Sequence, residues 1–239
     1  MTAEPQIQAS SSPHQHSMPH RAWLRFERLP AAYCHPGRIE TLLPDGLPEA
    51  FRDRLQGSTR LRPRLSAILA QRLDLAPCSL EDLATPEGRF AQLEGDDLKS
   101  ALRRIGAIWH ARKISKFIRS GALRQLIERL GRDNHRAALR LIDLAPADEE
   151  TPPPADASDG PGDIDVLMGL IDRDALLAVN AWCRGQPAAL AKRLRLKLPP
   201  CPEVDGEPPA SHRNQGVLIV DRMVRTLASE ADEGMDDHG

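Results

Sequence analysis

The chain has 239 residues, of which 41% are hydrophobic and 28% are charged, and its formal net charge at pH 7 is −2. These proportions are typical of a soluble globular domain and exclude wholesale disorder and a fibrous design, and a chain so close to neutral lacks the positive excess of a dedicated nucleic-acid-binding protein. Only 3% of the residues are aromatic, while Leu, Ala and Arg recur throughout, which predicts a mainly α fold, a compact multi-helix domain packed through aliphatic side chains.

The N-terminal part of the chain changes character at about residue 20. Residues 1–20 are polar and rich in Ser, Pro and His, so they bury too little apolar surface to offset the cost of ordering, and we predict a disordered tail. The segment 23–30 carries large apolar residues at Trp23, Leu24 and Phe26 and ends in proline, which predicts a short docking segment. Turns at 36–37 and 44–46 lead to a predicted helix over 49–55.

The middle of the chain has the strongest helical periodicity. Aliphatic residues on one face predict a helix over 63–76, and Ser79 begins another helix with the pattern of a capping box. The longest periodic segment, 96–119, is expected to form the helix that carries the core, with one buried face and one basic face. A shorter helix is expected to end at Gly131, and the pattern restarts over 133–144.

The last third of the chain is divided by a loop. Residues 145–163 are acidic, rich in proline and nearly free of large apolar groups, so we predict a flexible loop between two helical blocks. The second block begins at Ile164, and another helix begins at Pro187. Over 193–200 basic residues alternate with leucines, which suits either a helix end or an extended segment. A last helix is expected over 215–229, before an acidic tail that should be disordered.

These patterns divide the chain into three parts: a disordered tail (1–20), a helical domain (21–200, with the flexible loop 145–163) and a C-terminal region of linker, helix and acidic tail (201–239). No apolar run approaches the ~18 residues that a bilayer span needs, and the N-terminus lacks the apolar core of a signal peptide, so we expect a cytosolic protein. The four cysteines include no C-x-x-C pair, which is unlike a disulfide scaffold or a zinc ribbon.

Two clusters near the N-terminus could carry chemistry, and each has a simpler interpretation. His14, His16 and His20 could bind a transition metal, but a flexible segment of this kind is more typical of a solvated tail. Cys34 and His35 invite interpretation as a nucleophile and its base. Adjacent residues seldom face each other, however, and no catalytic motif accompanies them, which favours a buried cysteine and a histidine in a turn.

A third candidate lies on the strongest amphipathic helix. Trp109 is interpreted as a core anchor, and His110 as a flanking residue, because no acidic partner lies within sequence reach. We therefore predict no catalytic residue, no metal and no cofactor.

Basic residues cluster on and after the longest predicted helix. They could attract nucleic acid or anionic lipid through counterion release, but nearby carboxylates and the lack of interleaved aromatic residues favour a solvated helix face. A third interpretation is long-range attraction to an acidic partner surface, which also applies to the basic residues of 192–197. The cluster comprises Arg103, Arg104, Arg112, Lys113, Lys116, Arg119, Arg124 and Arg129. The residues predicted to contact a partner are Arg112, Lys113, Lys116, Arg119, Arg193, Arg195 and Lys197.

Three segments in order carry a resemblance to a known family: LRFERLPAAYCHP, IGAIWHARKISKFIRSGALRQLIERLG and ALAKRLRLKLPP. Across about 24–200 the chain resembles the SctK (YscK-type) proteins of the bacterial type III secretion sorting platform. The resemblance implies a cytosolic adaptor without enzymatic activity, located at the cytoplasmic face of the inner membrane through protein contacts. It implies an SctD-like ring protein and SctQ-like pods as partners, with SctL and the SctN ATPase as indirect ones, and no nucleic acid.

Two other functions stay open. The basic segment 103–129 suits a helical nucleic-acid-binding regulatory protein, which would bind DNA or RNA in a salt-sensitive manner. A small enzyme that uses Cys34 or His110 has the least support, because no catalytic motif accompanies either residue.

Overall fold

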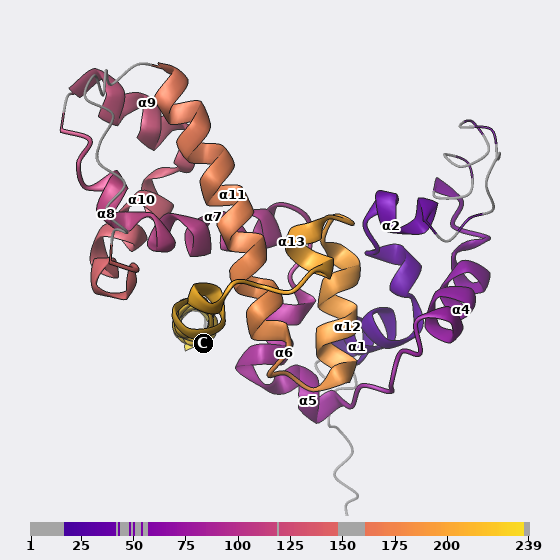
Figure 1. The fold of residues 1–239 in the computed structure, drawn as a ribbon. Coiled ribbons are helices and arrows are strands. Elements are labelled where there is room, and N and C mark those ends of the chain that lie inside the picture. Colours follow the sequence, from indigo (N-terminus) through magenta and orange to yellow (C-terminus); the bar gives the residue numbers. More distant parts are fainter. Residues whose placement is uncertain are drawn as a thin grey trace, which may run out of the picture.

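In the part of the chain that the structure describes, helices form all of the regular structure (Figure 1). The computed structural model describes residues 17–41, 43, 48, 50, 54, 57–118, 120–147 and 161–236, and these contain no strand. The prediction of a mainly α fold is therefore confirmed. The predicted tail up to residue 16, most of the helix predicted over 49–55 and residues 148–160 of the predicted loop lie outside the described residues.

The elements before the loop are α1 (Ser17–Arg28), η1 (Pro30–Ala32), α2 (Pro36–Glu40), α4 (Arg62–Arg72), α5 (Leu80–Ala84), α6 (Pro86–Gln92), α7 (Gly95–Trp109), α8 (Ala111–Ile114), α9 (Ser120–Leu130), α10 (Arg132–Arg140) and η2 (Ile142–Leu144). Those after it are α11 (Pro161–Cys183), α12 (Ala188–Lys197), α13 (Pro202–Asp205), the π-helical turn η3 (His212–Gly216) and α14 (Val217–Asp236). No helix within these described ranges is long and apolar enough to cross a bilayer.

Helices α7 and α11 cross at the centre of the molecule. The 23-residue helix α11 extends from the end that holds α8, α9 and α10 towards the middle, while α1, α2 and α4 lie at the opposite end (Figure 1). At the crossing, Gly106 of α7 approaches α11 so closely that a Cβ atom there would lie 2.0 Å from the carbonyl oxygen of Ile171. Only glycine permits this approach of two helix backbones.

Three clusters of buried side chains follow from this arrangement. The main cluster joins α1, α5, α6, α7, α11, α12 and α14 around Phe90 and Trp182, whose rings pack edge to face with centroids 5.5 Å apart. The second joins α7, α8, α9, α10 and the first half of α11 around Leu126. The third joins α2 and α4 to Leu196 of α12. The C-terminal region, which the sequence pattern set apart, contributes to the main cluster through residues such as Met223.

The single helix predicted over 96–119 is wrong. Helix α7 ends at Trp109, His110 has φ −95° and ψ 15°, and the next helix, α8, has only four residues. This turn directs Ala111 and Ile114 into the second cluster, where both are buried. Burial of these side chains compensates for the helical hydrogen bonds that the turn interrupts.

Other boundaries shift by a few residues. Helix α1 begins at Ser17, inside the predicted tail, and α11 begins at Pro161, inside the predicted loop. For residues 193–200 the sequence left a helix end and an extended segment open. The structure contains both, because helix α12 continues to Lys197 and the backbone is extended at Leu198. Helix α14 continues to Asp236, seven residues beyond the predicted end at 229. Local patterns place a helix well but place its ends poorly.

Candidate functional site

The first set of predicted contact residues lies on α8 and the segment that follows it. Together with α9 and α10 they belong to a region that we call the basic lobe (residues 111–140). This segment contains nine Lys or Arg residues against two Asp or Glu residues, although the chain as a whole is slightly acidic. Three of the predicted contact residues, Arg112, Lys113 and Lys116, are exposed there. The fourth, Arg119, lies outside the described residues.

Several cations of the basic lobe face solvent. Arg129 forms an ion pair with Asp165 of α11, whereas Lys113 and Arg124 are exposed and form no ion pair with any described residue. Ile118, between α8 and α9, is 83% exposed. The lobe therefore presents positive charge together with an isolated apolar side chain.

The two arginines of α7 that belong to the predicted basic cluster have acidic partners. Arg103 lies 3.8 Å from a carboxylate oxygen of Asp172, and Arg104 lies 3.6 Å from one of Glu230. The Arg103–Asp172 pair is exposed and contributes little to stability, whereas the Arg104 side chain is half-buried. The two pairs do neutralise much of the basic character of α7, so within the predicted basic cluster the excess of positive charge lies in the basic lobe.

The second predicted contact set, on α12, is mostly buried, which corrects its interpretation as a surface. Arg193 is 2% exposed and Lys197 is 8% exposed. Arg195 is half-buried and donates from Nη2 to Asn180 Oδ1 at 3.0 Å. Lys192 donates to the backbone carbonyl of Leu73 at 3.1 Å.

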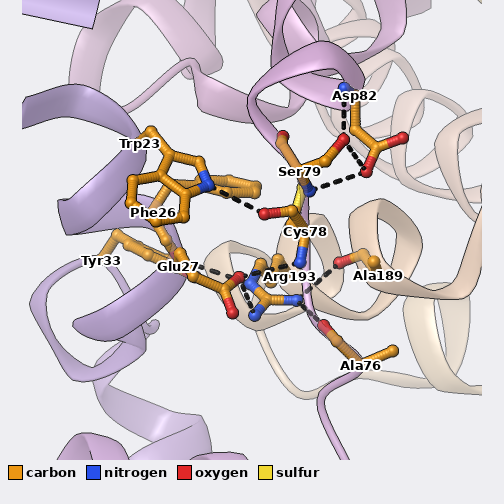
Figure 2. A network of polar contacts seen from close by, with 10 residues as sticks. All are labelled: Trp23, Phe26, Glu27, Tyr33, Ala76, Cys78, Ser79, Asp82, Ala189 and Arg193. Carbon is orange, nitrogen blue, oxygen red and sulfur yellow. Dashed lines mark hydrogen bonds and ion pairs between the residues drawn. The ribbon is translucent and has the colours of Figure 1, made fainter. Parts of the chain in front are cut away.

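Figure 2 shows how Arg193 is held in the interior. Its Nη2 donates to Glu27 Oε2 at 2.6 Å, and its Nη1 donates to the carbonyl oxygens of Ala76 at 2.6 Å and Ala189 at 3.2 Å. The same Glu27 oxygen accepts the backbone N–H of Cys78 at 3.0 Å. The network therefore fastens α1 and the segment before α5 to α12.

The surroundings of Cys78 extend this network (Figure 2). The indole N–H of Trp23 donates to the Cys78 carbonyl at 2.8 Å. The predicted capping box follows at once: Ser79 Oγ accepts the Asp82 N–H at 3.0 Å, and Asp82 Oδ2 accepts the Ser79 N–H at 2.8 Å. The predicted docking segment 23–30 is thus part of helix α1, fixed in place by polar contacts.

A second buried polar centre lies where α7, α11 and η3 meet. His110 Nε2 is 2.8 Å from Asp174 Oδ2, and His212 Nε2 is 3.4 Å from Asp174 Oδ1. The Trp109 ring stacks on the His212 ring with 4.0 Å between centroids. Asp174 is the acidic partner of His110 that sequence reasoning missed, because it lies 64 residues away on another helix.

This centre contains a histidine and a carboxylate, as many catalytic sites do, but its side chains are not accessible to a substrate from solvent. His110, Asp174 and His212 are each at most 6% exposed. Two cavities among the described residues are lined by other side chains. The arrangement instead joins three elements through one shared carboxylate.

The Asp174 carboxylate makes stability depend on pH. Burial raises its pKa, but the hydrogen bond with His110 and the close approach of His212 outweigh burial and hold the pKa well below its usual range. Because the folded-state pKa lies below the unfolded value, this stabilisation is present above the unfolded pKa and is lost as the pH falls. We expect Asp174→Asn to lose about 2 kcal/mol at pH 7.

The measurement is urea unfolding of both proteins at several pH values. The difference between wild type and Asp174→Asn should be nearly constant above about pH 5 and shrink from there towards pH 3, because the Asp174 carboxyl of the unfolded wild-type chain takes up a proton in this range while the folded carboxylate stays ionised. A difference that stays constant over this range would rule out an ionised Asp174 as the stabilising group.

Cys34 and His35 do not face each other as a nucleophile and its base, and Cys34 is buried as expected. Cys34 Sγ contacts the backbone oxygen of His35 at 3.7 Å, and His35 Nδ1 accepts the N–H of Gly37 at 3.2 Å. Burial raises the pKa of the Cys34 thiol to about 11, which disfavours the reactive thiolate. His14 and His16 lie outside the described residues. Within the described residues, no group of three or more His, Cys, Asp or Glu side chains is placed to hold a metal ion.

Comparison with known proteins identifies one matching family and two similar proteins. A family model, YOP proteins translocation protein K (YscK), matches residues 22–230. The nodulation protein NolU of Rhizobium fredii is 31% identical over 189 residues, which cover 74% of this chain and 78% of NolU. NolU of Sinorhizobium fredii (strain NBRC 101917 / NGR234) matches to the same extent. No solved structure matches the chain significantly.

Proposed function

This chain belongs to the YscK family of type III secretion proteins, and from this premise we propose that it is a cytoplasmic adaptor of the sorting platform. It links an SctD-like inner-membrane ring protein to SctQ-like pods and so acts indirectly on SctL and the SctN ATPase. It reaches the inner membrane through protein contacts and supports effector secretion without catalysing a reaction.

The basic lobe is the observation that supports this proposal most. Lys113 and Arg124 are exposed without an acidic partner among the described residues, and Ile118 is exposed near them in sequence. An acidic partner surface supplies the missing counter-charges, accelerates association through long-range attraction and leaves an apolar side chain to be buried on contact. Of the predicted contacts, Arg112, Lys113, Lys116 and Arg119 belong to this lobe.

Charge reversal in the basic lobe is expected to weaken partner binding. In the double variant Lys113→Glu, Arg124→Glu, attraction to an acidic surface becomes repulsion at two points. We expect the affinity for an SctQ-like pod protein or an SctD-like cytoplasmic domain to fall about tenfold or more, and effector secretion to fall with it. Titration calorimetry at two salt concentrations measures the loss, which should be larger at low salt.

The matched control reverses charge at the other end of the molecule. Arg60→Glu, Arg64→Glu changes two exposed arginines at the start of α4, far from the basic lobe (Figure 1). This control should bind both partners as the wild type does. If the basic-lobe variant also binds both partners normally, the lobe is not the contact; if a strain without this chain secretes normally, the adaptor role is wrong.

Nucleic-acid binding is the second candidate function, because the positive charge of the basic lobe could also attract phosphate groups. The continuous basic helix on which it depended is interrupted at His110, and the lobe offers a single aromatic residue, Phe117, for base stacking. A gel shift with DNA and RNA at low salt separates the two functions. No binding removes this candidate, whereas binding that the Lys113→Glu, Arg124→Glu variant loses supports it.

A further inference from the structure

A cavity of about 390 Å³ lies between the segment after α1, the beginning of α7 and the end of α12. Such a volume is typical of sites for small molecules. Apolar atoms of Leu98, Leu102 and Pro199 line it, together with the ring of Tyr33. Lys197, the last residue of α12, is the buried cation of its wall.

The surroundings of Lys197 are unusual for a buried ammonium group. Its Nζ donates to the Leu93 carbonyl at 2.9 Å and lies over the rings of Phe26 and Tyr33, 5.2 and 4.9 Å from their centroids. No described carboxylate forms an ion pair with it. Lysine is seldom buried to this degree unless it forms an ion pair. The ammonium group of Lys197 has three N–H donors, and the one carbonyl and two aromatic rings around it supply no anion to balance its charge.

The neighbouring groups do not supply that anion. The charged or titratable side chains around the cavity and the ammonium are Arg25, Tyr33, Cys34, His35, Glu94 and Lys99, with Arg193 one turn earlier on α12. Glu94 is the single carboxylate among them, and it pairs with Arg25 at 2.6 Å. Burial lowers the pKa of Lys197 to about 7, with a smaller raising effect from Glu94. Burial also raises the pKa of Tyr33 and Cys34, which stay neutral there.

We propose that this cavity binds a small organic acid whose carboxylate pairs with the ammonium of Lys197 and whose apolar part lies against Leu98 and Leu102. The site does not depend on the adaptor role. A carboxylate supplies the counter-charge that the fold omits, and its charge-assisted hydrogen bond forms where little water competes. The apolar walls select an acid with a short hydrocarbon part over a strongly hydrated anion.

Hexanoate is a suitable probe because it joins one carboxylate to a short apolar chain. We expect saturable binding with a Kd on the order of millimolar, given the small size of the probe. Hexanamide, which has the same shape without the charge, should bind about tenfold more weakly. The affinity for hexanoate should fall as the pH rises from 6 to 9, because Lys197 loses its proton in this range and hexanoate favours the protonated amine.

Nuclear magnetic resonance of the full chain labelled with ¹³C at lysine Cε reads both the binding and the titration of Lys197. Bound hexanoate should raise the pKa of Lys197, a change that a purely structural lysine would not show. Lys197→Met should lose the preference for hexanoate over hexanamide. The matched control is Lys99→Met. Lys99 is a second cation of the cavity wall, but its side chain is 76% exposed. The control variant should retain the preference for hexanoate over hexanamide.

Leu102→Trp keeps the test decisive if Lys197→Met fails to fold. The larger side chain fills the cavity and leaves Lys197 in place, so hexanoate should no longer bind or raise the pKa of Lys197. The proposal is overturned if hexanoate and hexanamide bind equally to the wild type, if hexanoate leaves the titration of Lys197 unchanged, or if neither compound binds.

Discussion

A single methyl group added at Gly106 is expected to lower the free energy of unfolding by roughly 3 kcal/mol or more, the upper end of the range for overpacking. The added Cβ atom would lie 2.0 Å from the carbonyl oxygen and 2.8 Å from the carbonyl carbon of Ile171. These are backbone atoms, so no side-chain rotation relieves the contact, and α7 and α11 must separate. Separation also loosens Ile105 and Ile108, which are fully buried. Urea unfolding of Gly106→Ala measures the loss.

The matched control is Gly169→Ala, on α11 itself. A Cβ atom at Gly169 meets nothing within 4 Å, and the residue is exposed. Alanine is the better helix former, so this variant should gain up to about 1 kcal/mol. Opposite signs for the two substitutions are the expected result. Equal effects would show that the close approach of α7 and α11 does not govern stability.

Most helices could be predicted from the sequence because their signals are local. One-faced aliphatic periodicity located α4 and α9, and the Ser79 capping box marked the start of α5. The end of α7 at Trp109 could not be predicted in this way. It depends on the packing of Ala111 and Ile114 in the second cluster, to which α11, a helix distant in sequence, contributes.

The candidate sites were predicted in part for the same reason. Lys and Arg side chains are mostly exposed in folded proteins, so the charged surface around Lys113 could be predicted from the local excess of these residues. Sequence spacing does not reveal the partner of a buried polar side chain: Glu27 lies 166 residues from Arg193, and Asp174 lies 64 residues from His110. The alternation of basic residues and leucines over 193–200 therefore suggested a basic surface, whereas in the structure Arg193 forms an internal ion pair with Glu27.

Replacement of Arg193 by methionine is expected to cost about 3–5 kcal/mol, the usual loss when one partner of a buried ion pair is removed. Methionine fills much of the space but donates no hydrogen bond. The carboxylate of Glu27 then loses its cation, and the carbonyl oxygens of Ala76 and Ala189 lose their donor. Urea unfolding monitored by circular dichroism measures this loss.

Two further variants test whether the ion pair causes the loss. Arg213→Met removes an exposed arginine that pairs with Glu207 at 2.8 Å, and it should cost less than about 1 kcal/mol. In Glu27→Leu, Arg193→Met both charges of this ion pair are removed, so the double variant should lose less than the sum of the single losses, by about 2 kcal/mol. The Ala76 and Ala189 carbonyls remain without a donor, which keeps the recovery incomplete. If Arg193→Met costs no more than Arg213→Met, the interior network does not fasten α1 to α12.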